Sequence, residues 1–138
     1  MLIVSWNCRG LGNPNKAKAV KDLLKLNSTD ILMLQETKID DEALLFLSRT
    51  KWKLNDGIAV SSCGSSGGLE TLWYEEKFHL KNSFVSHHWI FIKIQHNSSK
   101  IQLALFNLYV PVSFIKKREC WNSLSDFLET SSPYNLII

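Results

Sequence analysis

Residues 2–36 read LIVSWNCRGLGNPNKAKAVKDLLKLNSTDILMLQE, a stretch in which the hydrophobic period changes twice. Its first aliphatic residues, 2–4, followed by Trp6, are typical of a short buried strand. Residues 15–27 place apolar side chains at helical spacing and lysines on another face, which predicts an amphipathic helix. The continuous apolar run 31–34 is typical of a strand that is buried on both faces. We therefore expect a strand–helix–strand unit whose two strands lie parallel and adjacent.

The remainder of the chain predicts two more helices and a series of strands. Acidic residues at positions 40 and 41 precede an apolar helical pattern, which predicts a second helix over residues 41–49. The pattern then changes to β structure, with a hairpin turn at residues 97–100. A third helix is predicted after Pro111, and an apolar run of strand type occupies residues 134–138. The strands of the series are Leu69–Tyr74, Phe78–Val85, Trp89–Gln95 and Ile101–Tyr109.

Composition points to one packed domain in a reducing compartment. The 138 residues are 45% hydrophobic, enough for one core, and the formal net charge of +3 makes the surface mildly basic. The cysteines, at positions 8, 63 and 120, show no Cys-x-x-Cys spacing, which argues against a zinc site and against a disulfide-linked partner. The start of the chain lacks a signal-peptide pattern, and no apolar run approaches the ~20 residues of a membrane span. We therefore expect an intracellular protein, in the nucleus or the cytoplasm, with no membrane partner.

Two polar residues follow the predicted parallel strands. Asn7 comes directly after the first strand, and Glu36 comes after the second, separated from it by Gln35. Because parallel neighbours end side by side at one sheet edge, we expect Asn7 and Glu36 to lie together where open α/β sheets bind ligands. An amide oxygen beside a carboxylate suits Mg²⁺, which keeps several waters and takes only one or two carboxylates. Taken singly, each residue has a plainer interpretation, with Asn7 opening a loop and Glu36 in solvent.

Several sequence blocks resemble one family over essentially the whole chain. SWNCRGLG at residues 5–12 and DILMLQETK at residues 30–38 are very similar to the opening of the endonuclease domain of plant non-LTR (LINE-type) retrotransposons. That domain belongs to the endonuclease/exonuclease/phosphatase superfamily. The similarity continues, in the expected order, through SGGL at 66–69, LW at 72–73, NLYVP at 107–111, CW at 120–121 and LII at 136–138. The resemblance implies an α+β (α/β) fold, a partial four-layer α/β/β/α sandwich of the DNase I-like type.

The resemblance also implies roles for particular residues. Glu36 is expected to be the direct carboxylate ligand of a catalytic Mg²⁺, and Asn7 to lie at both the metal and the phosphate. The Tyr109 hydroxyl is expected to reach the scissile phosphate, since a neutral phenol donates to a phosphate oxygen. Without the resemblance, Tyr109 is more simply an aromatic residue at a strand end. Gly67 and Gly68 are expected to form a structural backbone turn before a core strand.

The resemblance further implies a truncated domain. The family pattern requires a Gly-Asp-Phe-Asn step after the strand that begins near Leu136, followed by a later Asp and His, and that four-residue motif is absent from the sequence. We therefore expect residues 1–138 to be an endonuclease/exonuclease/phosphatase domain cut before its carboxy-terminal half. The groups that position water and stabilise charge would be missing, so we expect no useful nuclease activity from the isolated chain. Val110 is a second departure, because retrotransposon relatives more often have Gly at that position.

Further expectations concern partners and the histidines. DNA is the partner that the resemblance implies, with the basic clusters at residues 16–25 and 116–118 as candidate contacts to its backbone. A partial second sheet predicts an uncovered apolar sheet face through which the chain could self-associate. Neighbouring strand residues point to opposite faces, so His87 and His88 cannot chelate one ion there, and we expect a solvated pair.

Three functions stay open at this point. The first is a Mg²⁺-dependent phosphodiesterase, a DNA endonuclease domain that is catalytically incomplete as an isolated chain. The second is a superfamily phosphatase that cleaves phosphate monoesters, against which the block WNCRGLG at residues 6–12 argues. The third is a non-catalytic gene remnant with at most weak metal or nucleic-acid binding.

Overall fold

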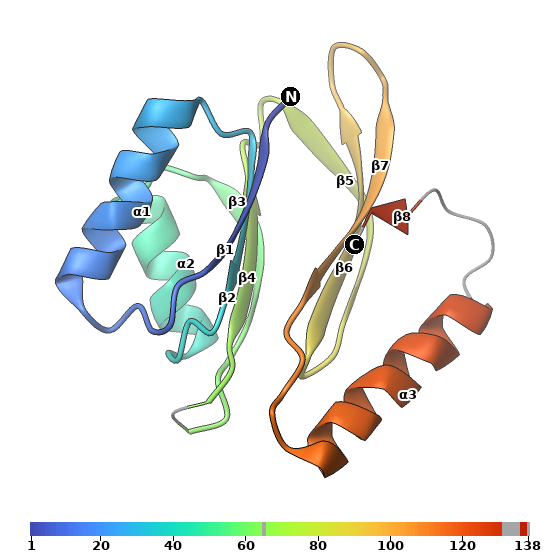
Figure 1. Cartoon of the computed structure of the whole chain (residues 1–138). Coiled ribbons are helices and arrows are strands. Elements are labelled where there is room, and N and C mark those ends of the chain that lie inside the picture. Colours follow the sequence, from blue (N-terminus) through green and yellow to red (C-terminus); the bar gives the residue numbers. More distant parts are fainter. Residues whose placement is uncertain (65, 131–135, 138) are drawn as a thin grey trace.

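The computed structural model describes residues 1–64 and 66–130, together with the backbone of residues 136 and 137. Two four-stranded sheets lie face to face, and helices flank them on their outer sides (Figure 1). The strand order is β1-β2-β4-β3 in the first sheet and β5-β6-β7-β8 in the second. The predicted α+β class, with two stacked sheets between helices, is therefore confirmed.

The predicted strand–helix–strand unit forms one half of the first sheet. β1 (Ile3–Asn7) and β2 (Ile31–Gln35) are parallel neighbours, and α1 (Pro14–Asn27) connects them. Their register pairs Asn7 with Gln35, so the two strands end together. The first four residues of β2 are buried, as its continuous apolar run predicted. The carboxyl ends of the two strands thus share one sheet edge.

β3 (Asp56–Val60) is a strand that the sequence analysis did not predict. It forms the edge of the first sheet and pairs antiparallel with β4 (Leu69–Trp73), which lies beside β2. Gly57 interrupts the apolar pattern of β3 because the Leu72 side chain crosses there, and a Cβ on Gly57 would stand 2.5 Å from Leu72 Cδ2. A residue without a side chain is needed at this close approach, which weakens the strand signal in the sequence.

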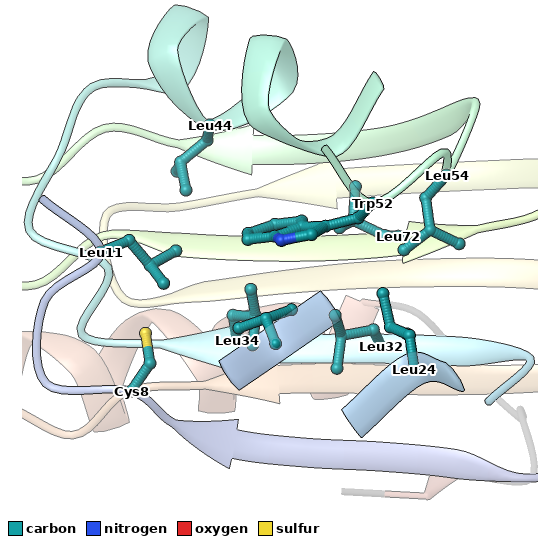
Figure 2. Packing of buried hydrophobic residues seen from close by; sticks show 10 residues of the cluster. Cys8, Leu11, Leu24, Leu32, Leu34, Leu44, Trp52, Leu54 and Leu72 are labelled. Atoms are coloured by element: carbon teal, nitrogen blue, oxygen red, sulfur yellow. The ribbon is translucent and has the colours of Figure 1, made fainter. Parts of the chain in front are cut away.

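Two helices cover the outer face of the first sheet. α1 and α2 (Asp41–Thr50) begin after Asn13 and Asp40, whose side chains accept backbone N–H hydrogen bonds at the helix starts. Between α2 and the strands lies the Trp52 ring, and its Nε1 donates to the Ala17 carbonyl oxygen of α1 at 2.9 Å (Figure 2). The buried side chains of this layer are Cys8, Leu11, Val20, Leu24, Leu32, Leu34, Leu44, Trp52, Leu54 and Leu72.

The second sheet contains the later strands of the chain. Its members are β5 (Phe78–Val85), β6 (Trp89–His96), β7 (Gln102–Leu108) and β8 (Leu136–Ile137), with β8 parallel to β7. Residues 134, 135 and 138 of the predicted terminal strand lie outside the described residues. Among the described helices, none has the length and apolar character needed to cross a membrane.

α3 (Phe114–Thr130) covers the outer face of the second sheet over β6 and β7. The alternation along β6 turns its isoleucines toward the first sheet, whereas Trp89 and Phe91 face α3. Phe127 of α3 packs on them, with its ring centroid 4.9 Å from that of Phe91. The apolar face that we expected to be uncovered is therefore packed in this region, because Leu124 and Phe127 lie one helical turn apart on the side of α3 that faces the sheet.

Candidate functional site

The candidate site lies at the sandwich edge where β1 and β2 end. Asn7, the last residue of β1, is exposed, and Glu36, the first residue after β2, is half-buried. Asn7 is paired with Gln35, so Glu36 directly follows its partner. Asn7 Oδ1 accepts the Arg9 N–H at 3.2 Å, and its Nδ2 has no hydrogen-bond partner among the described residues. Because an amide nitrogen is a donor, this orientation suits contact with an anionic phosphate oxygen.

The backbone around Glu36 is held from both sides. The Gly10 N–H donates to the Glu36 carbonyl oxygen at 2.7 Å, and the Thr37 N–H donates to the Gly68 carbonyl oxygen at 3.2 Å. Glu36 has a φ of 52° and Arg9 a φ of 50°, both in the left-handed region. Such a conformation costs about 1–2 kcal/mol per residue and persists where surrounding contacts enforce it. The Glu36 carboxylate is therefore carried by a fixed backbone at the sheet edge.

Tyr109 lies directly after β7, at the same edge of the sandwich (Figure 1). Its N–H donates to the His88 carbonyl oxygen at 2.9 Å, and its Cε1 lies 3.8 Å from where a Cβ on Gly67 would stand. Gly67 and Gly68 have φ values of 77° and 92° and connect Tyr109 with the backbone around Glu36. Tyr109 lines a hollow in the surface, whereas Asn7 and Glu36 do not line it.

Gly68 has no room for a side chain, because a Cβ there would overlap Thr37 Oγ1 and stand 3.1 Å from the Lys38 nitrogen. We expect Gly68→Ala to lower the free energy of unfolding by about 2 kcal/mol and to displace the Glu36 backbone. Urea denaturation and amide NMR shifts measure the two effects. Gly64→Ala is the matched control, since Gly64 has a φ of 62° but no described atom within 4 Å of its Cβ position. Equal losses in both variants would contradict a steric role for Gly68.

A pair of side-chain amides ties the two sheets together behind this edge. Gln35 Nε2 donates to Asn107 Oδ1 at 2.6 Å. Asn107 Nδ2 in turn faces three acceptors of the first sheet, the carbonyl oxygens of Leu34 and Glu70 and the hydroxyl of Thr71, at 3.2, 2.9 and 3.2 Å. Asn107 is 1% exposed, so these bonds lie in a buried interface between the sheets. The amide pair thereby fixes the distance between the end of β2 and the end of β7.

The residue pattern of β7 indicates that Asn107 is buried, and our site prediction did not use it. On β7, Leu103 and Leu105 face the first sheet, and Asn107 occupies the next inward position. A polar residue in an inward register needs buried hydrogen-bond partners. The period of two along β7 therefore identifies Asn107 as a structural residue located two positions before Tyr109.

Cys8 is a core residue rather than a candidate nucleophile. Its Sγ donates to the Gln35 carbonyl oxygen at 3.2 Å, and burial raises the pKa of its thiol above the usual value. A buried neutral thiol is unreactive. The Lys16 ammonium donates to the Cys8 carbonyl oxygen at 2.7 Å, and Arg9 and Lys38 are exposed in the neighbouring loops. These cations make the edge attractive to an anionic substrate.

The structure corrects the expectation for His87 and His88. They lie in the turn between β5 and β6, which the Ser86 N–H closes by donating to the Trp89 carbonyl oxygen at 2.9 Å. Their ring centroids are 6.5 Å apart. Both line a hollow of about 140 Å³ beside Tyr109, and His88 is half-buried rather than solvated. Burial, and next the charge of His87, lower the pKa of His88 below its usual value.

The side chains at the edge fit a Mg²⁺ site with one protein carboxylate. The Glu36 carboxylate makes no hydrogen bond or ion pair with another described residue. Mg²⁺ retains several waters and binds through one or two carboxylates, so a larger group of protein ligands is not required. Within residues 1–64 and 66–130, no three His, Cys, Asp or Glu side chains gather as a metal-binding cluster. The chemistry of this edge therefore suits Mg²⁺ better than zinc, which takes three or four protein ligands.

Two stacked mixed sheets between helices, with an amide and a carboxylate at the ends of adjacent parallel strands, define a fold of the DNase I-like type, α/β/β/α. The chain belongs to the Endonuclease/Exonuclease/phosphatase family, whose model matches residues 4–112. This match confirms the predicted superfamily. Members of the family hydrolyse phosphate esters.

Solved structures share this fold at low sequence identity. A mannosyl-6-phosphatase from Bacteroides thetaiotaomicron has a TM-score of 0.71 and 14% identity, covering 99% of this chain and 62% of that one. A humanized TDP2 from D. rerio has a TM-score of 0.65 and 14% identity, covering 95% and 60%. The Xenopus laevis APE2 catalytic domain has a TM-score of 0.58 and 19% identity, covering 88% and 49%. The chain thus spans about half to three fifths of the length of these structures, and no curated protein sequence matches it.

Proposed function

We propose that residues 1–138 form the metal-binding part of a Mg²⁺-dependent phosphodiesterase domain that acts on DNA, of the type found in plant non-LTR retrotransposons. The observation that carries this proposal is the pairing of β1 with β2, which puts Asn7 and Glu36 at adjacent strand ends inside the family-matched segment. The blocks SWNCRGLG and DILMLQETK, which surround these two residues, support the retrotransposon type.

Each candidate residue has a proposed role that its geometry supports. Glu36 would hold Mg²⁺, which when bound polarises the phosphodiester and offsets charge on the leaving oxygen. Asn7 directs an unpartnered amide nitrogen that can donate to a phosphate oxygen. Tyr109 would donate its phenol to the scissile phosphate. Gly67 and Gly68, with positive φ, would serve as the structural turn that connects these parts.

DNA is the proposed substrate, and two of the solved structures support this choice. D. rerio TDP2 is known in complex with a single-strand DNA product, and APE2 shares the fold. The runner-up is phosphate monoester hydrolysis, because the mannosyl-6-phosphatase has the same fold with a TM-score of 0.71. The exposed cations Arg9 and Lys38, together with Lys16, favour a polyanion such as DNA.

We further propose that catalysis needs groups that residues 1–138 do not contain. The family's Gly-Asp-Phe-Asn step occurs nowhere in the sequence. Its Asp prepares water for in-line attack, and losing several such groups removes roughly 10²- to 10³-fold in rate for each. A non-catalytic remnant is the corresponding alternative, and an in-frame Gly-Asp-Phe-Asn continuation in the genomic sequence after Ile138 would argue against it.

Glu36→Ala is expected to remove metal binding at the edge. Mn²⁺ serves as a paramagnetic substitute for Mg²⁺, and in the parent chain it should broaden amide NMR signals around Asn7 and Glu36. The variant should lose this broadening because the single carboxylate ligand is gone. Glu42→Ala, which removes an exposed carboxylate of α2, is the control and should leave the broadening unchanged. Persistent broadening around Asn7 in Glu36→Ala would overturn the ligand assignment.

The same variants test activity. Supercoiled plasmid incubated with the purified chain and Mg²⁺ should show no nicking above background, because the water-positioning groups are missing. Nicking that Glu36→Ala abolishes and Glu42→Ala does not would show an active enzyme and contradict the proposed incompleteness.

A further inference from the structure

The hollow beside Tyr109 is formed by four separate segments of the chain. They are the loop before β4, the turn between β5 and β6, the residues after β7, and the first turns of α3. We call it the histidine hollow, after His87 and His88, which line it together with Tyr109 and Lys116. Its volume is about 140 Å³.

The glycine wall of the histidine hollow presents backbone donors. The N–H groups of Gly67 and Gly68 donate to no other described residue, although Gly68 is buried. Buried N–H groups nearly always have a partner, so the Gly68 N–H indicates an acceptor that the described residues do not supply. Backbone N–H groups without a partner in the chain can donate to an anion. The glycine wall is thus suited to phosphate oxygens.

The opposite wall is held in place and includes the Lys116 cation. The His88 N–H donates to Ser86 Oγ at 3.1 Å, and the His88 carbonyl accepts from Tyr109, so the turn is held at both ends. After burial, the pKa of His88 is lowered by His87 and by the Lys116 cation, and Glu119 opposes these effects. Glu119 contributes the one carboxylate among the described residues of the lining. The lining thus contains one lysine and two imidazole rings beside this carboxylate.

Zinc is a poorer occupant for the histidine hollow. It would need at least three ligands of the His, Cys, Asp or Glu type, and the described part of the chain offers no such group. An anion meets the Lys116 ammonium, two imidazoles and the two glycine N–H groups. The donor set therefore selects a phosphate group.

The position of the hollow decides which phosphate it would take. Tyr109 borders it, but Asn7 and Glu36 do not line it. Across the two sheets, β2 contacts β7, and β4 contacts both β6 and β7. The hollow is lined by residues next to the ends of β4 and β6, so it is displaced from the end of β2. The proposed metal site and the hollow are thus neighbouring rather than identical sites.

We propose that the histidine hollow binds a second phosphate group, one that flanks the scissile phosphate of a nucleic acid, through Lys116, His87, His88 and the Gly67–Gly68 turn. This rests on the proposed function and narrows it, because a nucleic acid strand carries a phosphate next to the scissile one, whereas a simple phosphomonoester has only one phosphate. Tyr109 lies at the border between the two phosphate positions.

The test is an NMR titration of the whole chain without divalent metal, with inorganic phosphate in one arm and a single-stranded thymidine tetranucleotide in the other. Phosphate should shift the Gly67 and Gly68 amide signals and raise the pKa of His88, since an adjacent anion favours the imidazolium. The tetranucleotide should produce the same shifts at lower concentration and also shift the Asn7 amide, because it spans both positions.

Lys116→Met is expected to weaken phosphate binding about tenfold, because it removes a charge-assisted donor. Lys117→Met is the matched control, since Lys117 is an exposed lysine of the same helix turn that lies outside the hollow. No shift at Gly67 and Gly68, or equal weakening in both lysine variants, would overturn the proposal. Inorganic phosphate binding without any tetranucleotide effect on Asn7 would overturn the flanking role and indicate a small phosphorylated ligand.

These experiments can reject the proposed metal site and the proposed phosphate site independently of each other. Glu36→Ala should retain phosphate binding in the histidine hollow, since its carboxylate does not line it. Absence of Mn²⁺ broadening with phosphate binding intact would reject the proposed function alone. Mn²⁺ broadening at Glu36 without phosphate shifts would reject the hollow alone.

Discussion

Asn107→Ala is expected to lower the free energy of unfolding by about 3–4 kcal/mol, through the loss of four hydrogen bonds at one buried side chain. Alanine would remove the acceptor for Gln35 Nε2 and the donor to three acceptors of the first sheet, and Gln35 would keep its bond to Ser5 Oγ at 3.0 Å. A buried polar group that loses its partner costs about 1–3 kcal/mol. The loss should also loosen the end of β2 relative to the end of β7, and with it the positions of Glu36 and Tyr109.

Urea denaturation measures the stability change, and amide NMR shifts of Glu36 and Tyr109 report on the site. Asn82→Ala is the matched control, because Asn82 is exposed on β5 of the same sheet and accepts one N–H bond from Ser83 at 2.9 Å. That change should stay within about 0.5 kcal/mol. If Asn107→Ala also cost less than about 1 kcal/mol, water would have replaced the amide, and the cross-sheet tie would not explain the arrangement of the site.

Glu70→Met is expected to raise the free energy of unfolding by about 1–4 kcal/mol at pH 8, because it removes a carboxyl group that the core does not solvate. Glu70 lies fully buried on β4, and neither carboxylate oxygen has a hydrogen-bond partner among the described residues. Burial raises the pKa of Glu70 well above its usual value. The Ser48 hydroxyl opposes this shift, but it donates to the Leu45 carbonyl oxygen at 2.9 Å. Methionine has a similar length and shape and no polar group.

The raised pKa of Glu70 fixes the sign of the pH dependence. Below about pH 4, the usual range of a glutamate pKa, the folded and unfolded chains both hold the proton, and the carboxyl group costs least. As the pH rises, the unfolded chain releases this proton while the folded chain retains it, so the folded state loses stability. The loss continues until the pH passes the folded-state pKa. The difference between Glu70→Met and the parent chain should therefore grow with pH.

Denaturation curves between pH 4 and pH 8 check this prediction. Glu75→Met is the control, since Glu75 is the second residue after β4 and is exposed. It should give a stability curve parallel to that of the parent chain. A parallel curve for Glu70→Met as well would mean that Glu70 is ionised or solvated in the folded protein, which contradicts its unpartnered burial.

Much of the fold was predictable because its signals are local. The change of period between residues 2 and 36 predicted the β1-α1-β2 unit, and the alternation along β6 predicted a strand with two different faces. β3 was missed because it contains Gly57, a residue that weakens the strand pattern. Gly57 is needed there because the Leu72 side chain, 15 positions later in the chain, leaves no room for a Cβ, and the local sequence does not show that contact. The packing of α3 on β6 was missed for the same reason, and with it the coverage of the second sheet.

The candidate site was predictable in part. Parallel neighbours must end together, so the residue pattern was enough to place Asn7 and Glu36 at one edge. The histidine pair was misjudged because its two residues were treated as part of a strand, whereas they form a turn that faces Tyr109. The burial of Glu70 was not predictable from the sequence, since an acidic residue between apolar ones in a strand ordinarily faces solvent.

By itself, the sequence determined the class of fold, the order of the strands it predicted and the edge at which Asn7 and Glu36 meet. These depend on hydrophobic period, strand direction and short family blocks, all of which lie within a few dozen residues. Only the tertiary structure decided the Gln35–Asn107 tie, the buried carboxyl group of Glu70 and the hollow beside Tyr109. Gln35 and Asn107 are 72 residues apart, and no local pattern states which distant side chain will meet another across two packed sheets.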